Sequence, residues 1–308
     1  METLKVVGLI FYHWFKSIAL FFIPRHLRLK DVSSETVLIT GAGSGIGRLL
    51  AIKLASMVDN LVLWDIDEPR LQETGKEVQK AGGKCKLYTC DLSRKESVHE
   101  TVAKVKNDVG PITMIINNAG IVVGKPILEL SDDNIRRTFE VNTLSHFWII
   151  RSFLPDMMKK NHGHIVSLAS VASFVGSGKL TDYSASKAAA YSLQESLYLE
   201  LGAAGYDGIK FTSVCPYLIG TGMFHGASDK VIPMLTPEYV TDQIIEAIRT
   251  DQYILVLPRL FYFILALKSM IPIGAGFYLS KALGGLDMMK NFSGRNNNNE
   301  RNGHAKVN

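Results

Sequence analysis

The sequence predicts an α/β fold in which a doubly wound parallel sheet forms a single domain. Short apolar runs rich in β-branched residues, such as residues 36–40 and 163–168, alternate with stretches of helical character. Runs of this length bounded by turn residues are typical of buried strands. Strands that alternate with helices form a parallel sheet with helices on both faces, and a glycine-rich turn at residues 41–47 follows the first strand.

Composition predicts a globular chain in a reducing compartment. It has 308 residues, a formal net charge of +5 and 47% apolar residues, enough for a large core. The three cysteines, Cys85, Cys90 and Cys215, are odd in number and lack metal-ligand spacing. We therefore expect neither a disulfide framework nor a metal site. The charge is too weak and too scattered to favour nucleic acid as a partner.

An apolar segment at the start of the chain predicts a membrane anchor within residues 1–30. Residues 4–23 approach the roughly 20 apolar residues that a bilayer span needs. His13 and Lys16 interrupt this segment, and a central lysine costs about 2.5–3.5 kcal/mol on insertion. Cations at 25–30 follow without a small-residue cleavage site, so an uncleaved anchor facing the cytosol fits better than a signal peptide. A terminal helix that packs on the core is the alternative.

The glycine-rich turn predicts a nucleotide-binding loop. Gly41, Gly45 and Gly47 lie between the strand at 36–40 and a helical stretch at 48–57. Glycine permits a tight turn and close approach of backbone N–H groups to phosphate. The N-terminus of the following helix adds a partial positive charge. A glycine loop without a ligand is the alternative.

An acidic residue ends the second predicted strand, residues 61–64. Asp65 lies 24 residues after Gly41, close to the interval of roughly 20 residues expected for an acid that binds the adenosine ribose. A carboxylate there accepts hydrogen bonds from the ribose diol and repels a 2′-phosphate. No Arg or Lys lies in the loop before Gly47. The sequence therefore favours NAD over NADP, with a strand-end cap as the alternative role of Asp65.

The same alternation continues along the chain. Strands are expected at 86–90, 113–116, 163–168, 211–216 and 253–257, and helices at 73–81, 97–108, 132–158 and 237–250. Ligands of such sheets bind at the carboxyl ends of the strands. Those ends carry Gly41, Asp65, Asp91, Asn117, Ser170 and Pro216. Asp91 either meets the adenine there or caps the next helix.

Tyr183 and Lys187 form a candidate acid/base pair. They open an alanine-rich helical run, and residues four apart share one face of a helix. Free tyrosine has a pKa of about 10, and a nearby positive charge lowers it. We therefore expect Lys187 to lower the pKa of Tyr183, so that the hydroxyl takes a proton from an alcohol or gives one to a carbonyl.

Together these motifs resemble the short-chain dehydrogenase/reductase family over about residues 35–260. The matching residues, in family order, are Thr40, Gly41, Gly45, Ile46, Gly47, Asn117, Asn118, Ala119, Gly120, Asn142, Ser170, Tyr183 and Lys187. More narrowly, the chain is similar to the membrane- and lipid-droplet-associated branch that holds epidermal retinol dehydrogenase and the 17-beta-hydroxysteroid dehydrogenases 11 and 13. The apolar N-terminus and residues 62–66, 161–166 and 221–224 carry this closer likeness.

The resemblance implies a role for each matching residue. Tyr183 is the general acid/base, Lys187 lowers its pKa and holds the nicotinamide ribose, and Ser170 hydrogen-bonds the reacting oxygen. Asn142 helps to connect Lys187 to solvent through water. The implied cofactor-binding residues are Thr40, Gly41, Ser44, Gly45, Ile46, Gly47, Asp65, Asp91, Leu92, Asn118, Ala119, Gly120, Tyr183, Lys187, Pro216 and Thr221.

The resemblance also implies the reaction. It is an NAD-dependent hydride transfer, on a Rossmann-type fold, to or from a lipophilic alcohol or ketone such as a retinoid, steroid or fatty alcohol. The family often has glycine after Pro216, where this chain has Tyr217, so we expect a bulky side chain to shape the pocket. Two alternatives are a lipid-droplet coat or scaffold protein with little turnover and an NADPH-dependent carbonyl reductase.

The sequence divides into an anchor at 1–30, a catalytic domain at 31–285 and a disordered polar tail at 286–308. Residues 260–283 are apolar again and form either core or a second membrane contact. We expect the protein on the cytosolic face of the endoplasmic reticulum membrane and on lipid droplets. The resemblance further implies a homodimer through the helix that carries Tyr183 and the helix before it.

Overall fold

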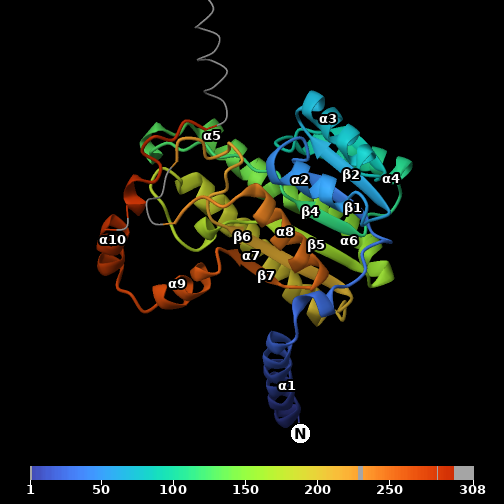
Figure 1. The fold of residues 1–308 in the computed structure, drawn as a ribbon, viewed down its shortest axis with the longest axis horizontal. Helices are drawn as coiled ribbons and strands as arrows, with labels where there is room; N and C mark the ends of the chain where they lie inside the picture. Colours follow the sequence, from blue (N-terminus) through green and yellow to red (C-terminus); the bar gives the residue numbers. More distant parts are fainter. Residues whose placement is uncertain (1, 228–231, 283, 295–308) are drawn as a thin grey trace, which may run out of the picture.

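The computed structural model describes residues 2–227, 232–282 and 284–294. Its centre is a sheet of seven parallel strands in the order β3-β2-β1-β4-β5-β6-β7 (Figure 1). The strands are β1 (Thr36–Thr40), β2 (Asn60–Asp65), β3 (Cys85–Thr89), β4 (Met114–Asn117), β5 (Gly163–Leu168), β6 (Ile209–Pro216) and β7 (Ile254–Leu257). Strand order reverses between β1 and β4, the point at which doubly wound sheets bind ligands. The predicted Rossmann-type parallel sheet is confirmed.

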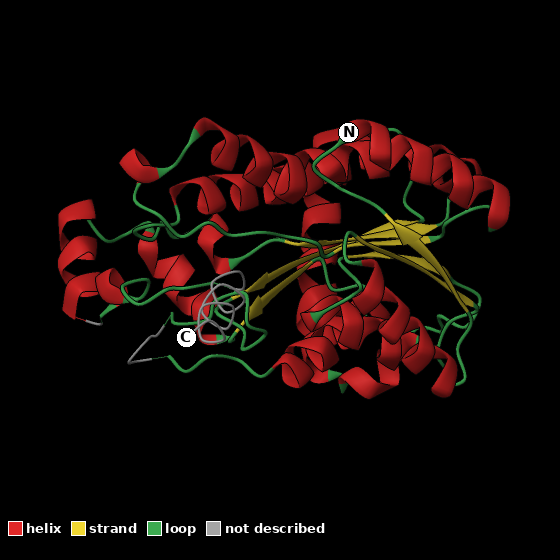
Figure 2. Cartoon of the chain, turned by 90° about the horizontal axis from the view of Figure 1, so that it is seen from above, coloured by secondary structure: helices red, strands yellow, loops and turns green. Residues whose placement is uncertain are grey.

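Helices cover both faces of the sheet (Figure 2). They are α2 (Gly45–Leu54), α3 (Glu68–Lys80), α4 (Lys95–Asp108), α5 (Asp132–Phe139), α6 (Ser145–Lys160), α7 (Thr181–Ala203) and α8 (Pro237–Arg249). Side chains alternate between the faces of a strand. In β1, Val37 and Ile39 therefore join the core beneath α2, α3 and α8, and Leu38 joins the core beneath α4, α6 and α7.

The single helix predicted at 132–158 is interrupted. A π-helical turn, Glu140–Leu144, separates α5 from α6. The apolar periodicity continues through this turn, which explains why the sequence indicated one helix. Asn142 lies within the turn, and insertions of this kind are frequent at functional sites.

Two short apolar helices follow the sheet, and they lead into a segment that corrects the predicted tail. The helices are α9 (Leu260–Lys268) and α10 (Ile273–Ala282). A 3₁₀ turn, Gly285–Asp287, comes next, and Met288 and Met289 are buried in an apolar cluster that includes Tyr183. Residues 286–294 are therefore part of the catalytic domain, because apolar side chains that can be buried are interspersed among the polar ones. The rest of the predicted tail, 295–308, lies outside the described residues.

The first helix, α1 (Glu2–Phe22), projects from the body of the protein (Figure 1). It coincides with the apolar run predicted as an anchor, and Trp14 is 70% and Phe15 67% exposed. The helix therefore does not pack on the core, which was the alternative prediction. Among the described residues, no helix combines the length and apolar character that crossing a membrane requires.

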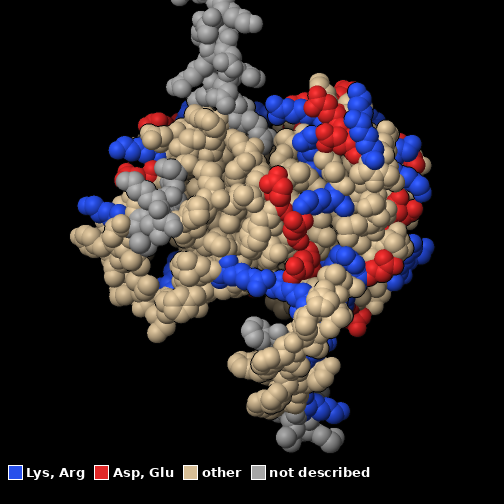
Figure 3. Space-filling model, in the orientation of Figure 1, with Lys and Arg blue, Asp and Glu red and all other residues tan. Residues whose placement is uncertain are grey.

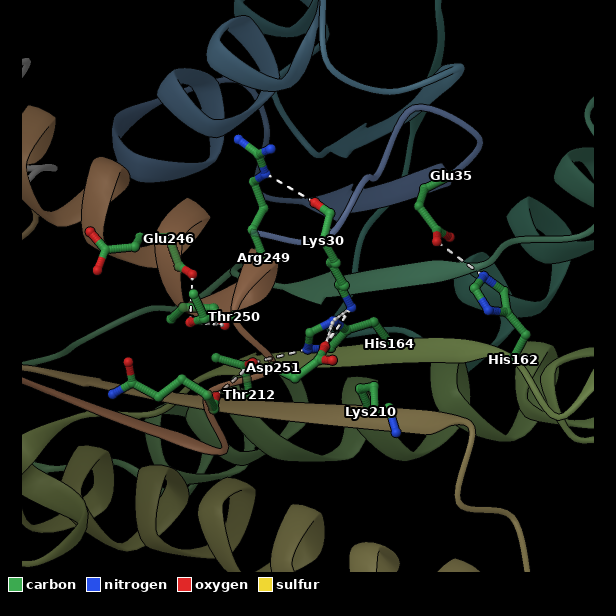
Figure 4. A network of polar contacts seen from close by, with 12 residues as sticks. Lys30, Glu35, His162, His164, Lys210, Thr212, Glu246, Arg249, Thr250 and Asp251 are labelled. Atoms are coloured by element: carbon green, nitrogen blue, oxygen red, sulfur yellow. Dashed lines mark hydrogen bonds and ion pairs between the residues drawn. The ribbon is translucent and has the colours of Figure 1, made fainter. Parts of the chain in front are cut away.

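A polar network joins the segment after α1 to the catalytic domain, as Figure 4 shows. The ammonium of Lys30 lies 2.6 Å from Asp251 Oδ1 and 3.0 Å from His164 Nδ1. Arg249 Nε donates to the Lys30 carbonyl oxygen at 3.2 Å. Burial, with the charges of Lys30 and Lys210, holds the pKa of His164 well below its usual value, so Nδ1 of the neutral imidazole accepts a hydrogen bond from the Lys30 ammonium. These contacts fix the segment at the amino ends of β5 and β6, opposite the predicted site.

Candidate active site

The glycine loop lies at the carboxyl end of β1 and begins α2. Gly41 and Gly45 have φ values of 67° and 55°, which glycine adopts without the strain a Cβ imposes. A Cβ on Gly47 would lie 2.1 Å from the carbonyl oxygen of Gly41, so the loop closes only with glycine there. A Cβ on Gly45 would meet Thr221 at 3.3 Å, which places Thr221 opposite the N-terminus of α2. This end of the helix suits a phosphate, and the residues present therefore fit a dinucleotide.

A second turn, after β4, is bonded to the glycine loop. The buried Thr40 hydroxyl accepts hydrogen bonds from the backbone N–H groups of Asn118 at 3.0 Å and Ala119 at 3.1 Å. Asn118 Nδ2 donates to the carbonyl oxygens of Thr40 and Gly41. Thr40, Asn118 and Ala119, which were predicted to bind cofactor, thus hold the two turns together. Ile46 is buried in the core, so its side chain faces away from the loop.

Asp65 lies next to the glycine loop, as predicted. Its Oδ2 accepts from the Gly43 N–H at 2.8 Å, and its Oδ1 accepts from the Asp67 N–H at 2.9 Å. Each carboxylate oxygen has a second lone pair for a ribose hydroxyl. The fold also brings Arg70 to the loop, since a Cβ on Gly43 would lie 3.3 Å from Arg70 Cβ. The sequence argument missed this cation, because it lies on α3 and not in the loop.

Asp91 and Leu92 follow β3. Asp91 Oδ1 accepts from both the N–H and the hydroxyl of Ser93, at 2.9 and 2.7 Å. This arrangement closes a turn before α4 and is not the helix cap that the sequence left open, because the N-cap residue of α4 is Arg94. Leu92 is buried in the core below α4 and α6.

The acid/base pair lies in a dry environment. Tyr183 is 5% and Lys187 4% exposed, and Lys187 Nζ lies 5.9 Å from the centre of the Tyr183 ring. Burial raises the pKa of Tyr183 to about 12, against the effect of a hydrogen bond with Ser170. Burial lowers the pKa of Lys187 to about 8. The prediction of a lowered tyrosine pKa is therefore wrong for the free protein, because desolvation disfavours the phenolate more than the hydrogen bond with Ser170 favours it.

Ser170 and Asn142 reach the pair from separate elements. Ser170 follows β5, donates to the Pro216 carbonyl oxygen at 3.3 Å, and accepts from the Ala172 N–H at 3.1 Å. Asn142 Oδ1 accepts from the Ile121 N–H at 2.8 Å, and its amide donates to Ser186 Oγ at 3.0 Å. The structure thus brings Ser170, Tyr183, Lys187 and Asn142 to one place, with Pro216 beside Ser170.

Gly120 explains how Lys187 is accommodated. A Cβ on Gly120 would lie 3.2 Å from Lys187 Nζ and 3.4 Å from Asn142 Oδ1. The ammonium donates to the Leu168 carbonyl oxygen at 2.6 Å. The small residue after Ala119 therefore leaves the room that the lysine head fills. The predicted cofactor residue Gly120 acts here as a spacer.

An apolar group that the sequence argument missed covers Tyr183. The Phe224 ring meets the Tyr183 ring edge to face, with centroids 5.7 Å apart, and the same cluster contains Leu218, Met288 and Met289. Tyr217, predicted to shape the pocket, packs against this cluster and donates to Met288 Sδ at 3.4 Å. A signal was present in the apolar residues of the supposedly polar tail, but their partners are far away in the sequence.

Comparisons with known proteins identify the family of the chain. The sequence model of the short chain dehydrogenase family matches residues 35–231. Epidermal retinol dehydrogenase 2 of Mus musculus is 44% identical over 270 residues, covering 86% of this chain and 87% of that protein. The 17-beta-hydroxysteroid dehydrogenase 13 of Rattus norvegicus is 40% identical over 258 residues, covering 84% and 85%.

Solved structures are similar as well. A short-chain dehydrogenase/reductase from Burkholderia phymatum in complex with NAD has a TM-score of 0.71 and 27% identity, covering 79% of this chain and 95% of its own. A metagenomic short-chain oxidoreductase in complex with NADP has a TM-score of 0.62 and 26% identity, covering 73% and 96%. The chain therefore belongs to the short-chain dehydrogenase family, in the branch of epidermal retinol dehydrogenase 2 and 17-beta-hydroxysteroid dehydrogenase 13.

Proposed function

We propose that this oxidoreductase transfers a hydride between NAD(H) and a lipophilic alcohol or ketone. The observation that carries the proposal is the meeting of Ser170, Tyr183 and Lys187 under the apolar cluster around Phe224. Polar groups that handle a proton beside apolar side chains suit a hydroxyl or carbonyl on an apolar molecule. The names of the relatives support a retinoid or steroid, and a fatty alcohol has the same chemistry.

Each residue of the site has a part in the proposed reaction. Bound NAD⁺ supplies the hydride acceptor, and NADH the donor. In oxidation, Tyr183 Oη takes the hydroxyl proton as the C–H hydride leaves; in reduction, it returns a proton to the carbonyl oxygen. The Ser170 hydroxyl donates a hydrogen bond to the same oxygen, where negative charge develops. Lys187 holds its charge beside the tyrosine and favours the phenolate once it forms.

NAD is the proposed cofactor because the Asp65 carboxylate lies beside the glycine loop, with one oxygen bonded to Gly43 and the other to Asp67. A 2′-phosphate would approach a carboxylate already fixed by Gly43 and Asp67, and like charges repel. The observation that favours NADP is Arg70, whose side chain is 51% exposed and forms a 3.3 Å ion pair with Asp67. Its guanidinium could bind a 2′-phosphate.

Cofactor titration of three proteins tests this choice. The wild type is expected to prefer NAD by at least about tenfold in kcat/KM, which is about 1.4 kcal/mol. Asp65→Ser is expected to raise relative NADPH use, and Arg70→Ala is expected to leave the NAD value unchanged and to lower NADPH use further. A wild type that prefers NADPH contradicts the assignment of Asp65 and favours the carbonyl-reductase alternative.

The experiment that tests the activity is a screen of purified full-length protein. Retinol, hydroxysteroids and long-chain alcohols are incubated with NAD and with NADP, and reduced cofactor is followed at its absorbance band. Turnover that is lost in Tyr183→Phe supports the proposal. Cofactor binding without turnover of any of these alcohols, or of the matching ketones, favours the lipid-droplet scaffold alternative, which the intact acid/base pair and the related dehydrogenases disfavour.

We further propose that the enzyme works at a lipid surface, on the cytosolic face of the endoplasmic reticulum and on lipid droplets. Mainly uncharged side chains cover α9 and α10 and most of α1 (Figure 3). Ile273 is 92% and Met270 78% exposed, and residues 252–286 contain three cations but no acidic residue. An apolar surface with only positive charges suits an anionic lipid surface. The anchor then lies along the surface, with Lys16 reaching the headgroups.

Removal of residues 2–23 tests this location. The deletion keeps Arg25 and Lys30, so their ion pairs with Glu246 and Asp251 still hold the catalytic domain. In lipid-loaded cells, a fluorescent fusion of the full chain is expected to stain droplets and the reticulum, and the same fusion of the deletion variant is expected to lose this staining. Equal staining contradicts the role of the anchor, and glycosylation at Asn291 contradicts the cytosolic topology.

We also propose a homodimer through α6 and α7. Both helices expose large apolar side chains: Phe147 on α6, and Tyr198 and Leu199 on α7. Burial of such side chains stabilises association at roughly 25 cal/mol per Å² of apolar surface before ordering costs. A matching surface on a second copy is the proposed partner.

A further inference from the structure

The segment Gly285–Gly294, here called the cap, lies over the reacting centre. Met288 and Met289 are buried in the apolar cluster of Tyr183, and Phe292 packs against the same cluster. The Phe292 ring lies 6.5 Å from that of Phe224, the residue stacked edge to face on Tyr183. The cap therefore holds apolar side chains where an apolar molecule bound to Tyr183 would lie.

The cap contacts the loops that follow three different strands. After β4, a Cβ on Gly124 would lie 2.2 Å from the Phe292 ring. After β5, Lys179 Nζ donates to the Met289 carbonyl oxygen at 3.3 Å. After β6, the His225 carbonyl oxygen accepts from the Ser293 N–H at 2.9 Å. Ser170 and Lys187 lie at this carboxyl edge of the sheet, bonded to the ends of β6 and β5. The cap therefore covers the residues of the proposed reaction.

The attachment of the cap is suited to release. Glycines with positive φ lie just before and at the end of it, Gly284 at 74° and Gly294 at 64°. Apart from the 3₁₀ turn Gly285–Asp287, the cap has no regular secondary structure. Its inner contacts are thioether and aromatic groups, which an apolar substrate replaces with contacts of the same kind. Tyr183 is only 5% exposed, so a substrate cannot reach its hydroxyl while the cap is in place.

We propose that the space held by Met288, Met289 and Phe292 is the subsite for the apolar body of the substrate, and that the cap is a lid that vacates it. This inference rests on the proposed function for the identity of the substrate. The subsite takes an aliphatic chain or a fused ring, with the hydroxyl or carbonyl directed to Tyr183 and Ser170. The cap contacts named above lie on the loops after β4, β5 and β6, whereas the glycine loop and Asp65, which would hold the adenosine end of the cofactor, lie at the ends of β1 and β2.

A reversible lock tests the lid. His225 and Ser293 are joined by hydrogen bonds between their backbones and between their side chains at 2.9 Å, so His225→Cys with Ser293→Cys places two thiols within disulfide reach. The full-length double variant is oxidised, the crosslink is verified by mass, and activity on retinol or a long-chain alcohol is measured before and after dithiothreitol. The two single variants and the oxidised wild type, with its three native cysteines, serve as matched controls.

The expected result is that oxidation lowers turnover of the double variant by at least about fivefold, as closure of a lid does, and that dithiothreitol restores it. Binding of NADH, followed by its fluorescence, is expected to stay within about twofold. A smaller decrease in turnover contradicts the lid, because a crosslink has no effect on a segment that does not move during turnover.

A second readout separates this inference from the proposed function. Retinol fluorescence reports binding without turnover, and the locked double variant is expected to bind retinol more weakly than the reduced one by the same factor. Phe292→Ala, which shortens the cap side chain in the subsite, is expected to tighten retinol binding, and Lys290→Ala, at an exposed position of the cap, is expected to leave it unchanged. If no alcohol is turned over in any state, the proposed function fails, and equal retinol binding by locked and reduced protein overturns the lid.

Discussion

Replacement of Tyr183 by phenylalanine removes one oxygen from the centre of the site. The ring keeps its place against Phe224 and the cap cluster, since the apolar contacts do not involve the hydroxyl. The change therefore isolates proton transfer. Tyr191→Phe, two turns further along α7 and packed on Phe174, is the matched control, because it makes the same chemical change away from the reacting centre.

The expected decrease in kcat follows from the loss of a general acid/base, about 10²–10⁴-fold, or roughly 3–5 kcal/mol in activation free energy. Stability changes little. The lost hydrogen bond with Ser170 is worth about 1 kcal/mol, and a protein of this size then melts a few degrees lower, about 2–4 °C. NAD(H) affinity is expected to stay within about twofold, because Lys187 remains.

The raised pKa of Tyr183 also predicts how the rates change with pH. A base must be deprotonated and an acid protonated to act. With the pKa of Tyr183 raised to about 12 in the free protein, oxidation of an alcohol should accelerate with pH through the alkaline range. Reduction of a ketone should be nearly independent of pH below that value. In Tyr183→Phe the oxidation profile loses this dependence.

The assay is steady-state turnover of the best alcohol from the screen, from pH 6 to pH 10, for the wild type and both variants. Rates of Tyr183→Phe within about threefold of the wild type refute the assignment of Tyr183. A Tyr191→Phe rate that falls as far as that of Tyr183→Phe shows that packing of α7, and not proton transfer, is being measured.

Three further predictions test the site and the assembly. Burial lowers the pKa of Lys187 from 10.5 to about 8, so between these pH values the unfolded chain binds more protons and the folded protein gains stability as pH rises. In urea titrations, the unfolding free energy of the wild type minus that of Lys187→Met should grow by up to about 3 kcal/mol from pH 8 to pH 10.5. A difference that does not change with pH contradicts the buried charge. Gly47→Ala places a Cβ 2.1 Å from a carbonyl oxygen, and it should weaken NADH binding at least about tenfold and lower the free energy of unfolding by about 1–3 kcal/mol. Gly202→Ala is the control, because the space around Gly202 in α7 is open, and it should raise the free energy of unfolding by about 0.5–1 kcal/mol. Leu199→Glu should shift the mass measured by light scattering in mild detergent from dimer to monomer, and a wild type that is already monomeric at micromolar concentration contradicts the proposed interface.

Features of the fold that depend on neighbouring residues were predictable from the sequence. The apolar runs became strands at nearly the expected bounds, because period-two and continuous apolar patterns reflect local backbone geometry and burial together. The glycine loop and the spacing of Tyr183 and Lys187 are also local, since a turn and a helix fix them within a few residues. The π-helical turn around Asn142 was not visible, because the apolar periodicity runs through it.

Tertiary structure alone decided the features that join distant parts of the chain. It bonds Thr40 to Asn118 across 78 residues, brings Arg70 to the glycine loop, and lays Met288 over the site of Tyr183. It also reversed the expected shift of the Tyr183 pKa, because the sequence showed the lysine charge but not the depth of burial. Desolvation depends on everything that surrounds a group, and the cap that completes this surrounding lies about 105 residues further along the chain.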